Sequence, residues 1–287
     1  MARVGRRKNA ISKYYEVNVA MMGRFLQGQR ALHSKDYARC LGVMNFTSIM
    51  EEIENMPTTK IVTNCINGFA TNNAALAYFA QGKPAVAYAT LLKARALLAK
   101  AITGVEDKEL QLFSLNYGSH LERITYNQVL CLLQQHPHSR AALPLAEHLA
   151  KNNPISKNYK YWYRQAQAHL SAQLDAVTPQ HARQALLQQA YHALSQAWLC
   201  LLRHEVPSEE VLRDVNRHSN IQEDDIAAII LRMRREAQQF RQSTITWLCY
   251  CALGLGQYRK CITHAKQALG GERLESTNRV NVQHYKY

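Results

Sequence analysis

The sequence predicts an all-α protein, a solenoid of stacked antiparallel helix hairpins. Small and apolar residues recur at steps of three and four, which keeps one face of an α-helix in register. The 12 glycines and 7 prolines fall mostly between these runs, where hairpin turns are expected. No segment shows the two-residue alternation of several strands. Apolar residues make up 47% of the 287-residue chain, enough for a continuous core between hairpins.

The clearest hairpin lies in the alanine-rich segment 72–98, which Gly82-Lys83-Pro84 interrupts. Glycine takes the left-handed conformation that ends a helix without strain, and proline fits the first turn of the next helix. Small side chains on either side of the turn would let two antiparallel helices approach closely. The residues expected to form this repeat core are Ala75, Tyr78, Gly82, Ala87, Leu91 and Ala94.

The same register occurs again near the end of the chain. The second set of repeat-core residues comprises Cys249, Ala252, Gly256, Cys261, Ala265 and Ala268. Two degenerate copies follow the same steps, one from Gly28 to Met44 with Lys35 at the turn, the other from Val129 to His148 with His136 at the turn. This pattern is typical of the tetratricopeptide repeat.

The chain divides into a basic tail, residues 1–13, and a single superhelical domain, residues 14–287. We expect hairpins over 14–55, 60–101 and 108–151, a helix pair over 157–174 and 179–204, and a long helix with a last hairpin over 223–270. Thr178 is a candidate cap for the helix that follows it. After Gly270-Gly271 another helix is expected, the first of a hairpin that would lack its second helix. The chain is therefore interpreted either as part of a longer repeat pattern or as one whose end packs on a partner.

No catalytic, metal or cofactor site is predicted. The chain has no Gly-rich phosphate loop and no His-Glu-x-x-His helix. His136 and His138 flank a proline, but no third metal ligand accompanies them. The seven scattered cysteines suggest reduced, buried thiols in a cytosolic or nuclear protein. There is no run of eighteen apolar residues, so a membrane span is not expected.

The net charge of +14 favours acidic partners, either nucleic acid or acidic protein surfaces. Aromatic and basic residues alternate in KNYKYWYR, residues 157–164, which could stack on single-stranded bases. Alternatively, Tyr161 and Trp162 belong to a helix core, and the lysines are solvated. Of the two interpretations, the helix core is preferred.

The expected partner surface is the concave face of the hairpins. The candidate contact residues are Asn72, Asn73, Tyr126 and Asn127. Asparagine in such a groove can pair with an extended peptide backbone. The alternative is that Asn72 and Asn73 only cap or begin a helix.

Several blocks, in order over residues 18–287, resemble one protein family. They are GRFLQGQRALHSKDYARCLGVM, NNAALAYFAQGKPAVAYATLLKAR, ERITYNQVLCLLQQHPHSRAALPLAE, YKYWYRQAQAHL, HARQALLQQAYHAL and STITWLCYCALGLGQYRKCITHAKQAL. The family is the tenth subunit of the CCR–NOT mRNA deadenylase complex, a tetratricopeptide-repeat family. The order and unequal spacing of the blocks are more specific than any one of them.

The resemblance implies a non-catalytic adaptor that docks with the large NOT scaffold subunit and the eleventh subunit of the same complex. Its role would be to support poly(A)-tail shortening, mRNA decay and translational repression in the cytoplasm, or also in the nucleus, with mRNA contacted indirectly. Two other functions are weighed against it. One is a co-chaperone-type clamp for acidic carboxy-terminal peptides, and the other is a basic helical-repeat protein that binds RNA directly.

Overall fold

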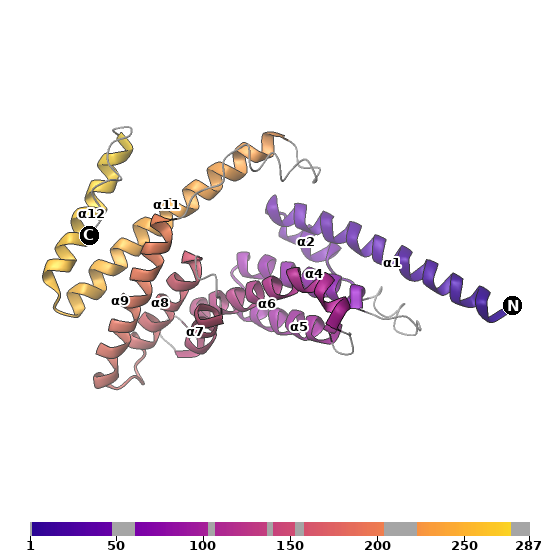
Figure 1. Ribbon diagram of the computed structural model, residues 1–287, viewed down its shortest axis with the longest axis horizontal. Helices are drawn as coiled ribbons and strands as arrows, with labels where there is room; N and C mark the ends of the chain where they lie inside the picture. Colours follow the sequence, from indigo (N-terminus) through magenta and orange to yellow (C-terminus); the bar gives the residue numbers. More distant parts are fainter. Residues whose placement is uncertain are drawn as a thin grey trace. The chain divides into compact units, whose positions relative to one another are not determined.

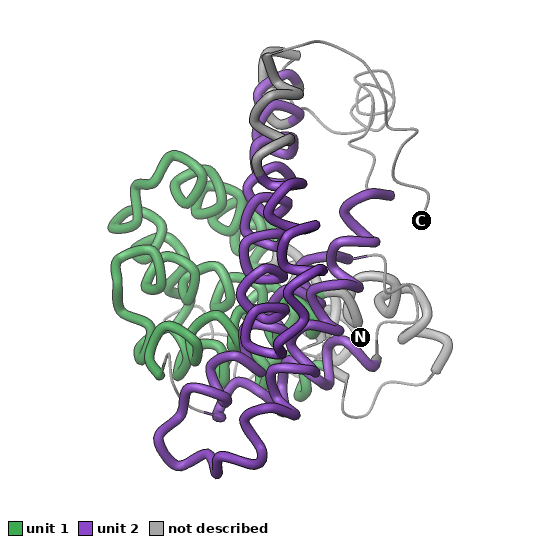
Figure 2. Tube along the Cα trace, turned by 90° about the vertical axis from the view of Figure 1, so that its left-hand side faces the viewer, with its two compact units in different colours: residues 1–137 green, residues 138–287 purple. Residues whose placement is uncertain are grey.

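The computed structural model describes residues 2–47, 61–102, 107–136, 140–152, 158–203 and 223–276 (Figure 1). Over these ranges the regular structure is helical and contains no strand, which confirms the all-α prediction. The chain divides into two compact units, residues 1–137 and 138–287, coloured separately in Figure 2. Each unit is described by itself. The single superhelical domain expected over 14–287 stays a prediction.

The first unit is a series of helices in which each packs on its neighbours in the chain. Its described helices are α1 (Ala2–His33), α2 (Tyr37–Val43), α4 (Ile61–Ala80), α5 (Pro84–Ile102) and α6 (Asp107–Gln135). Helix α4 contacts α1, α2, α5 and α6. Helix α1 begins at Ala2, so residues 2–13 of the expected basic tail are helical and continuous with the first hairpin.

The second unit follows the same principle. It comprises a 3₁₀ turn (Arg140–Ala142) and the helices α7 (Leu143–Asn152), α8 (Tyr159–Leu174), α9 (Gln180–Leu202), α11 (Glu223–Gly254) and α12 (Tyr258–Ser276). Helix α7 packs on α8, α8 on α9, α9 on α11, and α11 on α12. Since α6 belongs to the first unit and α7 to the second, the hairpin expected over 108–151 is divided between them.

Three hairpin turns share one backbone conformation. Lys35, Gly82 and Gly256 have positive φ angles of 62°, 73° and 70°. At each turn two backbone N–H groups bond back into the preceding helix; at the second turn Gly82 bonds to Phe79 and Lys83 to Tyr78, both at 3.0 Å. This is the Schellman arrangement, which satisfies carbonyl groups at a helix end. The three residues also hold the same position in the sequence register.

The core of the first unit lies between α4, α5 and α6. Ala75, Ala87, Leu91 and Ala94 are buried there, and Tyr78 packs against them. Gly68 permits the close approach of α4 to α5, because a Cβ at this position would lie 2.7 Å from the Leu98 side chain. A second cluster joins α1 and α2 to α4.

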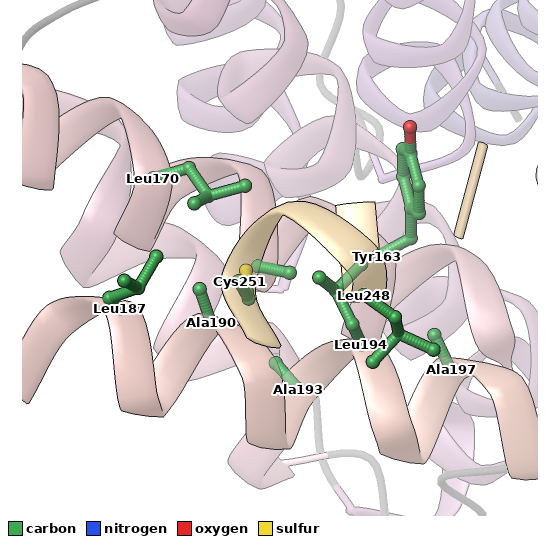
Figure 3. Close-up of a cluster of buried hydrophobic side chains, with 10 residues drawn as sticks. Tyr163, Leu170, Leu187, Ala190, Ala193, Leu194, Ala197, Leu248 and Cys251 are labelled. Carbon is green, nitrogen blue, oxygen red and sulfur yellow. The ribbon is translucent and has the colours of Figure 1, made fainter. Parts of the chain in front are cut away.

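The core of the second unit joins α8, α9 and α11. Leu187, Ala190, Leu194 and Ala197 line one face of α9, and Leu248 and Cys251 of α11 pack against them (Figure 3). The small residues of α9 let the helices pack closely. In the last hairpin Ala252 is buried, whereas Cys249, Cys261, Ala265 and Ala268 are half-buried. The outermost helix, α12, packs mainly on α11.

Two sequence expectations about helix ends are wrong. Helix α12 continues through Gly270-Gly271 to Ser276, so no new helix begins there. Each glycine costs a helix interior about 1 kcal/mol, which lowers the helix propensity but need not end a helix. Thr178 does not cap α9; its hydroxyl donates to the carbonyl of Ala172 and accepts from Arg140 Nε. The side chain therefore closes the end of α8 rather than the start of α9.

Candidate partner-binding surface

Two of the predicted contact residues, Asn72 and Asn73, lie in the middle of α4. The helix begins eleven residues earlier at Ile61, so the alternative that they cap or begin a helix is wrong. Both side chains are buried, at 6% and 8% exposure. Buried amides need hydrogen-bond partners, because leaving one unpaired costs about 1–3 kcal/mol.

Helix α6 packs on this face of α4 and brings one of the other two predicted residues, Asn127, to it. Asn127 Nδ2 donates to Asn72 Oδ1 at 3.1 Å. One turn before Asn72 on α4, the ring of Phe69 stacks on that of His120 of α6, with the ring centroids 3.9 Å apart. Tyr126 is half-buried on α6 beside Asn127. The structure therefore brings Asn72 and Asn127 together, and these two amides bond to each other.

Other polar groups are buried near this contact. Gln128, the residue after Asn127, is 1% exposed, and its Oε1 has no hydrogen-bond partner among the described residues. Burial lowers the pKa of His120, and the neighbouring Arg123 lowers it further. His120 is therefore held neutral against Phe69 at physiological pH. The α4–α6 contact is a polar layer inside the first unit.

The face of α11 in the same register is exposed except at Trp247, which packs against the core of the second unit. The two repeats are aligned by matching Ala75 with Cys249 and Gly82 with Gly256. The face that carries Asn72 and Asn73 on α4 then corresponds on α11 to Thr246, Trp247, Tyr250 and Leu253, which we call the α11 face. The exposed fractions of Tyr250 and Leu253 are 42% and 56%. Trp247 is half-buried and meets Tyr250 edge to face, with ring centroids 5.5 Å apart. Sequence reasoning missed these residues, although the repeat register offered the signal.

The positions equivalent to the α11 face in the first unit are Asn72, Asn73, Leu76 and Phe79 of α4. There the corresponding face is buried or half-buried. The two repeats thus differ in the exposure of one helix face, which is buried or half-buried on α4, where α6 contacts Asn72, and mostly exposed on α11. The residue types also differ, because the two asparagines are replaced by Thr246 and Trp247.

Basic side chains dominate the middle of the α11–α12 hairpin, whereas acidic residues lie toward its two ends, at Glu223, Asp224, Asp225, Glu272 and Glu275. Residues 230–268 contain Glu236 as their one acidic residue, against Arg232, Arg234, Arg235, Arg241, Arg259, Lys260 and Lys266. Glu236 is already paired with Lys160 Nζ at 2.7 Å. Arg241 donates to the carbonyl of Leu201. The remaining exposed cations give this hairpin a positive potential, which attracts acidic partners.

The aromatic segment KNYKYWYR is part of the core of the second unit. Tyr159 and Tyr163 are buried, and both meet Phe240 edge to face with centroids 5.2 and 5.0 Å apart. Trp162 packs against the same cluster. Because intramolecular contacts occupy these rings, the core interpretation is favoured over base stacking; Lys157 lies outside the described residues.

The described residues bring together no group of three histidine, cysteine or acidic side chains that could hold a metal ion. His136 lies at the end of α6, and His138 falls outside the described residues. All seven cysteines are free thiols. Burial raises the pKa of Cys131 to about 11 and that of Cys251 to about 12, so both stay protonated at neutral pH. None of the described helices is long and apolar enough to span a bilayer.

Comparisons of the chain with protein-family models, with curated proteins and with solved structures found no match. The function is therefore inferred from the residues and contacts of the chain itself. Two features contribute most to the inference. One is the polar face of α4 that α6 covers, and the other is the exposed aromatic face of α11.

Proposed function

We propose that this chain is a non-catalytic adaptor that binds partner proteins through a helical-repeat surface. The observation that carries the proposal is the α11 face. Its residues Tyr250 and Leu253 are exposed, whereas the equivalent face of α4 is buried or half-buried and is contacted by α6 at Asn72. Aromatic side chains gathered on one exposed helix face are typical of protein interfaces, since tyrosine and tryptophan dominate binding energy there.

We further propose that the hairpins are tetratricopeptide-like repeats. Three turns at equivalent positions share a left-handed residue and the same pair of backbone hydrogen bonds, which supports this assignment. In such repeats the first helix of each hairpin faces the concave groove. Helices α4 and α11 would then be groove helices, and Asn73 and Trp247 would be equivalent groove positions.

The specific adaptor we propose is a subunit of the CCR–NOT deadenylase complex of the tenth-subunit type. Its support is the ordered series of sequence blocks over residues 18–287. The partners would be the large NOT scaffold subunit and the eleventh subunit. The role would be to support poly(A)-tail shortening, mRNA decay and translational repression, with mRNA contacted indirectly. The compartment would be the cytoplasm or also the nucleus.

The two alternatives have less support. A clamp for acidic carboxy-terminal peptides would use free asparagine amides, whereas Asn72 and Asn127 bond to each other. Direct RNA binding by residues 157–164 would need accessible rings, whereas Tyr159 and Tyr163 are buried. The exposed arginines of α11 remain compatible with either an acidic protein or RNA.

The test is purification of the tagged full chain from its own cells, with and without nuclease, followed by mass spectrometry. The adaptor proposal expects NOT scaffold and deadenylase subunits in near-equal amounts, unchanged by nuclease. Recovery of chaperones instead would favour the clamp. Partners that disappear after nuclease treatment would favour the RNA-binding alternative, and absence of NOT subunits would refute membership of the complex.

A further inference from the structure

We infer that the α11 face binds an acidic amphipathic helix of a partner protein. This inference rests on the proposed function as a partner-binding adaptor, and it names the surface and the chemistry of the occupant. Thr246, Tyr250 and Leu253 are separated by steps of four and three, so they lie on one side of α11. Trp247 supports Tyr250 from the same side.

The first unit shows what kind of element this face accepts. On α4 the position equivalent to Thr246 is Asn72, which is covered by a helix, α6, through Asn127. One turn earlier on α4, His120 of the same helix stacks on Phe69, whose equivalent on α11 is Ser243. The two α6 residues are seven apart, which is two helical turns on one side. A helix of at least three turns would cover the α11 face in the same way.

The side chains of the α11 face indicate which residues the partner helix should carry where it contacts this face. On α4 the amide of Asn72 bonds to the amide of Asn127 on the covering helix. At the equivalent positions α11 has aromatic and aliphatic side chains instead. A buried polar group without a partner is costly, so the occupant should be apolar where it contacts Trp247, Tyr250 and Leu253. Apolar residues at i, i+3 or i+4, and i+7 of the partner helix satisfy this requirement.

The charges of the α11–α12 hairpin indicate which charged residues the partner helix should carry beside its apolar contact residues. Residues 237–268, which surround the α11 face in the sequence, hold four charged residues, all basic and exposed: Arg241, Arg259, Lys260 and Lys266. The one carboxylate among residues 230–268 is paired with Lys160. Carboxylates flanking the apolar stripe of a partner helix would therefore be attracted, and a basic helix would be repelled.

Photo-cross-linking in cells tests the assignment. Tyr250 is replaced by p-benzoylphenylalanine in the tagged full chain, and the matched control carries the same group at Leu92, which is 48% exposed on α5. After irradiation the cross-linked peptide is sequenced. The inference expects an acidic segment of another protein with apolar residues at helical spacing, at least fivefold enriched over the control. It is overturned by a cross-link to RNA, to a second copy, or to this chain itself, and by no excess over the control.

A synthetic peptide of the captured segment then provides a binding measurement by fluorescence anisotropy. The double variant Tyr250→Glu, Leu253→Glu should bind it at least tenfold more weakly, because it removes apolar area and repels carboxylates. Leu92→Glu should bind it as the unchanged chain does. Equal affinity for the double variant and the unchanged chain would overturn the inference. If NOT subunits co-purify but position 250 gives no cross-link, the proposed function stands and only the surface assignment fails.

Discussion

The shared hairpin turn makes a prediction in which one substitution has opposite effects at two sites. Gly82 has a φ of 73°, and a Cβ there would meet no atom within 4 Å, so its replacement strains only the backbone. A left-handed alanine costs about 1–2 kcal/mol, offset by about 0.4–1 kcal/mol from the reduced freedom of the unfolded chain. Gly82→Ala should therefore destabilise the first unit by roughly 1 kcal/mol.

The matched control is Gly23, inside helix α1 of the same unit, where a Cβ also meets nothing within 4 Å. Alanine is favoured over glycine in a helix interior by about 1 kcal/mol, so Gly23→Ala should stabilise the unit. The complementary change is Lys35→Gly, which removes a left-handed lysine. It should stabilise the unit by roughly 0.5–1 kcal/mol, since glycine tolerates this conformation but loses more freedom on folding.

Urea unfolding of the full chain provides the assay. Trp162, Trp198 and Trp247 are the three tryptophans, and all lie in the second unit, so their fluorescence reports that unit alone. Far-UV circular dichroism reports both units. With an m-value of about 1–3 kcal/mol per molar urea, 1 kcal/mol shifts the first-unit midpoint by roughly 0.3–1 M. Shifts of the same sign for Gly82→Ala and Gly23→Ala would refute the turn argument.

Three further predictions concern the buried groups. Asn127→Ala should destabilise the first unit by about 1–3 kcal/mol, because it leaves the Asn72 amide unpaired, and Asn72→Leu combined with Asn127→Leu should recover most of that loss in urea unfolding. Leu248→Ala should cost the second unit about 2–5 kcal/mol, seen as a lower midpoint by tryptophan fluorescence; a loss below about 1 kcal/mol would contradict its place in the core. Burial lowers the pKa of His169 in the folded protein, although Glu147 opposes this. As the pH falls, His169 is therefore protonated at a higher pH in the unfolded chain than in the folded one. The contribution of neutral His169 to the free energy of unfolding should be full above about pH 6.5 and should decrease as the pH falls below that value. In a pH series of urea midpoints, His169→Gln should make this decrease smaller.

Sequence patterns predicted the local features of the fold well. Gly82 and Pro84 marked the end of α4 and the start of α5, because both residues restrict the backbone whatever surrounds them. Lys35 was placed at a turn by register alone, and the structure gives it a positive φ. Gly270-Gly271 misled the prediction, because glycine lowers helix propensity without necessarily ending a helix.

The candidate site was predicted less completely. Asn72, Asn73 and Asn127 were predicted to line a partner groove, but the hydrogen bond between Asn72 and Asn127 joins positions 55 residues apart. Nothing in the local pattern specifies that contact. Thr178 was identified as a helix-end residue, yet the direction of its side chain depends on Arg140 and the carbonyl of Ala172.

By itself, the sequence determined that the chain is helical, where its clearest hairpins turn and which residues share a helix face. These properties follow from backbone restrictions and from the helical period, which act within a few residues. Only the tertiary structure decided that α6 covers the asparagine face of α4 and that Tyr250 and Leu253 of α11 are exposed. Periodicity shows that a face is apolar or polar, but the packing of distant helices decides whether it is buried or left exposed for a partner.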